Sequence, residues 1–173
     1  FYNGKYKVTF LAESNSGNTT SSNQIVITVT GGLNPPQERI AIIIAGGGSD
    51  SSNLLWKATE SNANFIYKTL YDRGFRYEDI FYLSPKTLTD FDGNDQEDDI
   101  IDTPAPRGRP LTDKDLIAAF EWAKTRGKLG QPLYLFFLDH GDREKIALAK
   151  GTFLGASQLK DMLDDYQKVT GND

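Results

Sequence analysis

The chain has 173 residues, of which 38% are hydrophobic, 25% charged and 12% aromatic. This composition is that of an ordinary globular protein with one domain, or with one domain and part of another. The formal net charge is −5, and basic and aromatic residues do not cluster, which argues against a nucleic-acid partner. No apolar stretch is long enough to cross a bilayer, so we expect no membrane span.

Residues 1–30 are predicted to form β-structure. Apolar residues alternate with polar ones at Tyr6, Val8 and Phe10, and again at Ile25, Ile27 and Val29. The segment between them, residues 13–23, is rich in Ser, Asn, Gly and Thr and is predicted to be a loop. This pair of strands resembles the last two strands of an immunoglobulin-like β-sandwich. A linker rich in glycine and proline follows at residues 31–37.

From residue 38 the pattern changes to strands that alternate with helices. The apolar run 40–45 predicts a buried strand, and Gly46-Gly47-Gly48 predicts a tight turn after it. A helix that ends at Gly74 is predicted from apolar and small residues at helical spacing: Leu55, Ala58, Asn62, Ile66 and Leu70. Residues 80–83 predict a second strand.

An acidic segment follows the second strand. Seven acidic residues and no basic residue occupy positions 90–102. Oxygen-bearing side chains at alternating positions match the spacing of calcium loops of the EF-hand and thrombospondin-repeat type. The candidate ligands are Asp90, Asp92, Asn94 and Asp98. Asp95 stands where such loops usually carry glycine. The alternative is an acidic loop that only faces solvent; a bound calcium ion would order the loop and take no part in chemistry.

The remaining elements complete an α/β pattern. Residues 112–115 predict a capping box for a helix that ends near Gly127. Residues 133–138 are apolar throughout and predict a third strand, buried on both faces. A short hairpin at 146–148 and 152–154 is predicted next, and Ser157 is predicted to cap a helix whose apolar face holds Leu159, Met162, Leu163 and Tyr166. This order predicts a mostly parallel sheet that three strands leave incomplete.

His140, the only histidine, lies two residues after the end of the third predicted strand. Ligands of open α/β sheets bind beyond the carboxyl ends of the strands, so His140 is the first candidate catalytic residue. Gly141 offers a backbone N–H without a shielding Cβ, which suits an oxyanion hole. Asp139 is interpreted as structural, because adjacent residues of a strand point to opposite faces.

A histidine base needs a nucleophile, and the chain contains no cysteine. Ser49, Ser51 and Ser52 follow the first strand, but the Gly-x-Ser-x-Gly motif is missing, which argues against a serine hydrolase. The triple glycine also lacks the spacing of nucleotide-binding loops. It is interpreted as a turn that lets substrate approach the backbone.

Several ordered segments together resemble the bacterial legumain-like cysteine peptidases, which belong to the caspase clan. The segments are residues 42–48 (IIIAGGG), 53–59 (NLLWKAT), 63–67 (ANFIY), 74–75 (GF), 80–84 (IFYLS), 137–141 (FLDHG) and 151–153 (GTF). The resemblance covers residues 38–173. It implies a caspase-like three-layer fold, of which this chain holds the histidine-bearing N-terminal half.

The resemblance also implies roles for single residues. His140 would be the catalytic base or acid, Gly141 would lend its amide to the oxyanion hole, and Asn53 would be the third catalytic residue. The nucleophile would be a cysteine beyond Asp173, in the C-terminal half of the same domain, and the substrate would be a polypeptide. The protein would be secreted by a bacterium, to the periplasm or outside the cell. A second hypothesis is a catalytically inactive caspase-like pseudoenzyme with a structural or adhesive role.

Overall fold

The computed structural model describes residues 4–8, 11–13, 19–21, 25–29 and 39–172. The chain divides into two compact units, residues 1–37 and 38–173. Each unit is described by itself. The predicted linker 31–37 and Phe10 lie outside the described residues.

The first unit contains two short antiparallel strand pairs. Strand β1 (Gly4–Val8) pairs with β4 (Ile25–Val29), with Tyr6 opposite Ile27, and β2 (Leu11–Glu13) pairs with β3 (Thr19–Ser21). The two predicted strands are therefore confirmed. The predicted loop 13–23 was wrong in part, because β3 lies inside it and pairs with β2. The likeness of this hairpin to an immunoglobulin-like sandwich stays a prediction.

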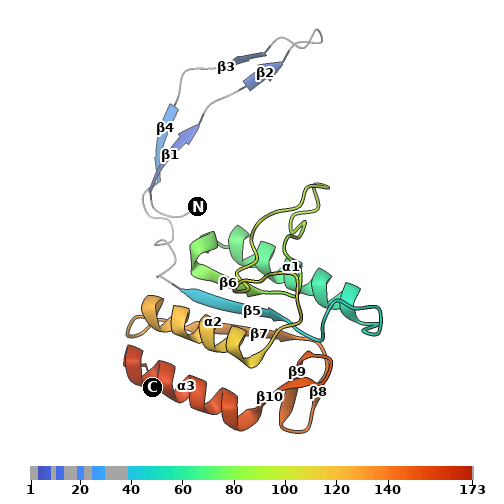
Figure 1. Cartoon of the computed structure of the whole chain (residues 1–173). Coiled ribbons are helices and arrows are strands. Elements are labelled where there is room, and N and C mark those ends of the chain that lie inside the picture. Colours follow the sequence, from blue (N-terminus) through green and yellow to red (C-terminus); the bar gives the residue numbers. More distant parts are fainter. Residues whose placement is uncertain (1–3, 9–10, 14–18, 22–24, 30–38, 173) are drawn as a thin grey trace. The chain divides into compact units, whose positions relative to one another are not determined.

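The second unit is built on a parallel sheet of three strands (Figure 1). Its members are β5 (Ile40–Ala45), β6 (Ile80–Leu83) and β7 (Leu133–Leu138), in the order β6-β5-β7. Both neighbours pair in parallel with the central strand β5. A 3-10 turn, η1 (Tyr77–Asp79), leads into β6. The predicted α/β class and its parallel sheet are confirmed, and the three strands have their predicted bounds.

Helices cover both faces of the sheet (Figure 1). Helix α1 (Trp56–Asp72) packs on the face that carries Ala41, Ile43 and Ala45, while α2 (Asp113–Arg126) and α3 (Ala156–Thr170) pack on the face that carries Ile40, Ile42 and Ile44. Alternate residues of a strand point to opposite faces, so β5 supplies both layers of the core. Every residue of β5 is buried, as the apolar run predicts.

The buried face of α1 differs from the predicted one. Of the predicted residues, Leu55, Ala58 and Asn62 are exposed, and Leu55 precedes the helix. The residues that face the sheet are Trp56, Thr59, Ala63, Tyr67 and Leu70. The predicted face was therefore wrong: along most of the helix the buried residues lie about one position after the predicted ones, and only Leu70 belongs to both sets. The apolar pattern misled because the true stripe includes a threonine and a tyrosine, which carry polar groups.

The predicted capping box of α2 is confirmed. Thr112 is the N-cap and Asp115 the third helical residue of the box, and the Thr112 N–H donates to Asp115 Oδ2 over 2.8 Å. The Thr112 hydroxyl donates to the same oxygen over 3.0 Å. Arg109 adds a bidentate ion pair to the same buried carboxylate, with both N–O distances 2.7 Å. This pairing satisfies a charge that would otherwise be costly to bury.

The predicted cap of α3 was wrong. Ser157 lies inside the first turn, and Gly155 precedes the helix and donates its N–H to Gln158 Oε1 over 2.9 Å. The predicted apolar face is confirmed: Tyr166 is buried, and Leu159, Met162 and Leu163 pack against the core cluster.

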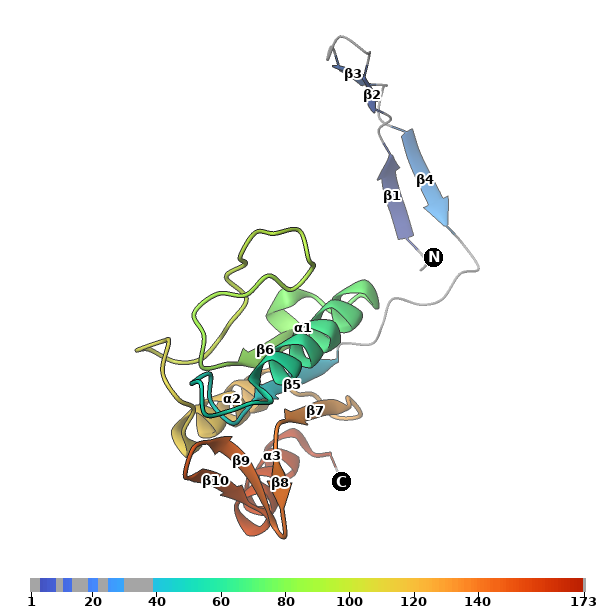
Figure 2. The same cartoon turned by 90° about the vertical axis from the view of Figure 1, so that its right-hand side faces the viewer.

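Strand β7 is less buried than predicted. Its residues are partly exposed along the whole strand, and Tyr134 is 37% exposed. The reason is its position at an edge of the sheet, where β5 covers one side. After β7 the chain forms a separate antiparallel sheet from β8 (Gly141–Asp142), β9 (Lys145–Ala149) and β10 (Thr152–Gly155) (Figure 2). The predicted hairpin corresponds to β9 and β10. Among the described residues, no helix has both the length and the apolar character that crossing a membrane requires.

Candidate active site around His140

The carboxyl ends of β5 and β7 lie side by side. The Gly46 N–H, just after β5, donates to the Leu138 carbonyl oxygen at the end of β7 over 2.9 Å. From β5 the chain crosses to β6 on one side, and it later returns to β7 on the other side of β5. In open α/β sheets such a reversal leaves a crevice beyond the strand ends, where ligands bind. The segments after β5 and β7 supply the residues described next.

His140 is presented at this edge with its side chain 61% exposed. Its ring Nδ1 is in hydrogen-bond contact with Asp139 Oδ1, and its backbone N–H donates to the same oxygen over 2.6 Å. The interpretation of Asp139 as a residue pointing away from His140 was therefore wrong. Strand alternation ends at Leu138, and Asp139 has a φ of +144°, which turns its side chain back to the imidazole.

The Asp139 carboxylate is fully buried and fixed from two sides. Its second oxygen, Oδ2, accepts hydrogen bonds from Asn53 Nδ2 over 3.0 Å and from Thr59 Oγ1 over 3.1 Å. Burial alone would raise the pKa of Asp139. The hydrogen bonds from His140, Asn53 and Thr59 outweigh burial and hold the pKa below its ordinary value. Asp139 is therefore an ionised acceptor at neutral pH.

Asn53 lies at the site, as expected, but its hydrogen bonds go elsewhere than the imidazole. Its Nδ2 donates to the Gly48 carbonyl oxygen over 2.9 Å as well as to Asp139, and its Oδ1 accepts the Leu55 N–H over 3.0 Å. Asn53 thus ties the start of α1 to the turn after β5 and to the carboxylate.

Two of the three glycines after β5 make room for protein groups. A Cβ on Gly46 would lie 2.3 Å from the Ala147 carbonyl oxygen in β9, and a Cβ on Gly47 would lie 2.1 Å from Asp139 Oδ2. Gly47 also has a φ of +76°, which glycine adopts without strain. The hairpin and the carboxylate therefore occupy the space that side chains would take at these two positions. The interpretation of this turn as one that lets substrate approach the backbone stays a prediction.

Gly141 begins the edge strand β8, opposite Ile146. The Ala147 N–H donates to the His140 carbonyl oxygen over 3.0 Å, which places His140 and Ala147 at a hydrogen-bonded position of the ladder, although the His140 N–H itself donates to Asp139 Oδ1. Such pairs alternate with non-bonded pairs along an antiparallel ladder. The next pair, Gly141 with Ile146, is of the non-bonded type, and the Gly141 N–H therefore points away from β9. This orientation leaves the amide available to a ligand.

A depression of about 510 Å³ adjoins the imidazole. Its lining includes Gly47, Ser52, Asn53, His140, Lys150 and Phe153. The Ser52 hydroxyl donates to the Asp50 carboxylate and accepts from Lys150 Nζ over 3.4 Å. Its proton is thus directed to Asp50, which agrees with the argument against a serine nucleophile.

The acidic segment forms a closed loop at a separate place. The backbones of Thr89 and Asp98 bond to each other in both directions, over 2.9 and 3.2 Å. From α1, Asn64 Nδ2 donates to Thr89 Oγ1 over 2.8 Å and to the Asp90 carbonyl oxygen over 3.1 Å. The ring of Phe91 packs edge-on against Tyr67, with centroids 5.0 Å apart. The two ends of the loop are therefore anchored to each other, and its start is anchored to α1.

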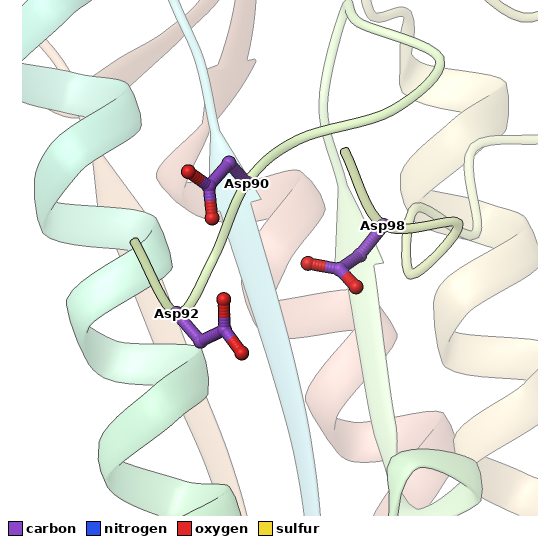
Figure 3. Close-up of side chains that lie close together, drawn as sticks. All are labelled: Asp90, Asp92 and Asp98. Atoms are coloured by element: carbon purple, nitrogen blue, oxygen red, sulfur yellow. The ribbon is translucent and has the colours of Figure 1, made fainter. Parts of the chain in front are cut away.

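Three of the four predicted ligands converge in this loop. Carboxylate oxygens of Asp90, Asp92 and Asp98 lie within 4.8 Å of one another, and the three side chains point into a shared space (Figure 3). One oxygen of Asp98, Oδ2, is buried and has no hydrogen-bond partner among the described residues. The amide of Asn94 is used within the loop, because its oxygen accepts the Gln96 N–H over 2.8 Å. Asp90 and Asp92 accept hydrogen bonds from within the loop, so the unmatched acceptor of the cluster among the described residues is Asp98 Oδ2.

The loop also shows why its departures from a standard calcium loop are tolerated. Asp95 adopts a φ of +65°, the conformation for which such loops use glycine, and aspartate enters this region more readily than most residues. The Asp90 carboxylate accepts the N–H groups of Gly93 over 2.8 Å and Asp95 over 3.0 Å. Desolvation would raise the pKa of Asp90, but these backbone hydrogen bonds lower it overall.

The sequence singled out His140, Gly141 and Asn53 as candidates, but it did not indicate the contacts that Asp139 makes with His140 and Thr59. Asp139 could have been found from its place next to His140, had strand alternation not been carried past the end of the strand at Leu138. Thr59 has no local signal, since it reaches the site only through the packing of α1 on the sheet.

Comparisons of the chain with models of protein families, with curated proteins and with solved structures find no match.

Proposed function

We propose that residues 38–173 are the histidine-bearing part of a cysteine endopeptidase with a caspase-like fold. The observation that carries the proposal is the placement of His140. An imidazole stands exposed at the carboxyl edge of a parallel sheet, and a buried carboxylate contacts its Nδ1. This is the arrangement that a base needs when it serves a nucleophile. The resemblance of the surrounding segments to legumain-like peptidases supports the same reaction.

In the proposed reaction, a cysteine thiolate attacks the carbonyl carbon of a peptide bond. His140 takes the thiol proton and returns it to the leaving amine, which makes the expulsion of the amine possible. The Gly141 N–H, which points away from β9, donates to the oxyanion of the tetrahedral intermediate. The cysteine belongs to the C-terminal half of the domain, on a strand that follows Asp173. The polypeptide substrate occupies the depression beside His140.

The test is made on the protein with the sequence that follows Asp173. We expect a strand that ends in Cys-x-Ser-Gly and hydrolysis of peptides that a thiol-alkylating reagent abolishes. Absence of that cysteine, or hydrolysis unaffected by alkylation, would contradict the proposal. The first of these results is the one that the pseudoenzyme hypothesis predicts.

We also propose that the loop 90–98 binds calcium as a structural ion. Calcium takes six to eight oxygen ligands, and Asp90, Asp92 and Asp98 supply three carboxylates in one place. The buried Asp98 Oδ2, for which the described residues supply no donor, supports a cation at this point. Since the proposed protein is secreted, we expect the affinity of an extracellular module, with a Kd of about 0.1–1 mM.

Calorimetric titration of the chain with calcium chloride tests this site. Asp92→Asn removes one ligand charge from an exposed position, so we expect the binding heat to disappear over that concentration range. Glu97→Gln is the matched control, because it removes the same charge from the same loop outside the cluster. A wild type without binding heat, or an Asp92→Asn variant that binds as the wild type does, would exclude the site.

A further inference from the structure

We infer that Asp139 is the positioning residue of His140, and that Asn53 and Thr59 act on the imidazole only through Asp139. The inference rests on the proposed function, in which His140 Nε2 exchanges a proton with the nucleophile. It assigns the third position of the catalytic arrangement to a carboxylate on the residue before the histidine. Asn53, the candidate for that position from the resemblance, becomes a support for that carboxylate.

The hydrogen bonds of the carboxylate are the basis of this assignment. An ionised carboxylate has no proton and can only accept. Its Oδ1 contacts His140 Nδ1, so a hydrogen bond between the two requires the proton on Nδ1. The neutral ring then has its lone pair on Nε2, where a base must have it to take a proton from a thiol. Asp139 therefore selects the tautomer that can react.

The second oxygen explains why the carboxylate stays in place. Asn53 Nδ2 and Thr59 Oγ1 both donate to Oδ2, and both residues lie near the start of α1. These two bonds fix the carboxylate plane, and the plane in turn fixes the direction of Oδ1. Partners behind a ligating or catalytic histidine orient the ring in this way in other sites.

The backbone at Asp139 is strained, which argues that the carboxylate is needed where it is. A φ of +144° belongs to a region that glycine occupies freely and that costs other residues about 1–3 kcal/mol. The chain also keeps Gly47 opposite, where any Cβ would collide with the carboxylate. A residue with a purely structural role at this turn would be better served by glycine.

The test is the tautomer of His140, measured by NMR on the 173-residue chain. Since the chain has one histidine, its ring nitrogens give unambiguous signals. At about pH 8.5, where an ordinary imidazole is neutral, we expect the Nδ1–H form to predominate in the wild type. Asp139→Gly removes the acceptor and relieves the backbone strain, so we expect the fold to be retained and the Nδ1–H form to be lost.

Two further variants separate positioning from a general disturbance of the site. Thr59→Val keeps the shape of the side chain and removes one support, so we expect a partial loss of the Nδ1–H form. Asp142→Asn removes a nearby exposed carboxylate that pairs with Lys145, and we expect no change. An unchanged tautomer in Asp139→Gly, or a wild type with the proton on Nε2, would overturn the inference.

This measurement needs no nucleophile and is independent of peptide hydrolysis. A fixed Nδ1–H tautomer in a protein without peptidase activity would refute the proposed function and leave the positioning by Asp139 intact. If the protein is an active peptidase and the His140 tautomer is the same in the wild type and in Asp139→Gly, only the positioning by Asp139 would be refuted.

Discussion

At the scale of single residues, the site depends on a close approach between Gly47 and Asp139. The glycine supplies both a positive φ and an empty side-chain position, and the carboxylate fills the space. Sequence reasoning recognised the triple glycine as a tight turn but could not say what came near it. The partner is distant along the chain, so the reason for the glycine lies in the packing of β5 beside β7.

Replacement of Gly47 by alanine tests this approach. We expect Gly47→Ala to lower the free energy of unfolding through both backbone strain and collision with the Asp139 carboxylate. Gly151→Ala is the matched control, because Gly151 has a φ of +75° and a Cβ there would meet nothing within 4 Å. We expect Gly47→Ala to be less stable than the control by about 1–3 kcal/mol, the usual effect of overpacking. If urea unfolding shows that both variants lose the same free energy of unfolding, the close contact between Gly47 and Asp139 would be contradicted.

At the scale of elements, the sequence correctly predicted the strands that consist of continuous apolar runs. The strands β5, β6 and β7 were located to the residue, because each run is bounded by turn or polar residues. The face of α1 was wrong, since Thr59 and Tyr67 belong to the buried stripe and Leu55 does not. An apolar run does not show which elements will pack on it. Strand β7 is apolar throughout and is nevertheless partly exposed.

The open edge of β7 predicts a pattern of hydrogen exchange. The Leu138 carbonyl oxygen accepts from Gly46, so the backbone groups of Leu138 and Phe136 face β5. Those of Phe137 and Leu135 face the other edge, because alternate residues of a strand bond to opposite sides. We expect slow exchange at Phe136 and Leu138 and fast exchange at Leu135 and Phe137, measured by NMR.

Hydrogen exchange at the amides of Leu135 and Phe137 also tests whether a further strand pairs with β7 in a longer protein. In the protein with the sequence that follows Asp173, we expect Leu135 and Phe137 to become protected as the C-terminal half adds a strand beside β7. Protection of these two amides in the 173-residue chain alone would contradict their assignment to an open edge. Fast exchange in the longer protein would contradict the added strand.

At the scale of the whole molecule, the second unit has its candidate active site at one end of a three-layer α/β structure. Strand β5 supplies the core of both helical layers, and the segments after β5 and β7 supply the candidate active site. The acidic loop lies after β6 and is anchored to α1, apart from the imidazole. Folding therefore brings together, at the carboxyl edge of the sheet, residues from two separate parts of the sequence.

The central claim is that His140 transfers the proton in peptide hydrolysis, and its most direct test is the effect of His140→Ala on kcat/KM. The measurement uses the protein with the sequence that follows Asp173, with Asp142→Asn as the control. We expect His140→Ala to lose a factor of about 10²–10⁴, the usual contribution of a general acid or base, while the control keeps the wild-type value. Hydrolysis that persists unchanged in His140→Ala would contradict the account.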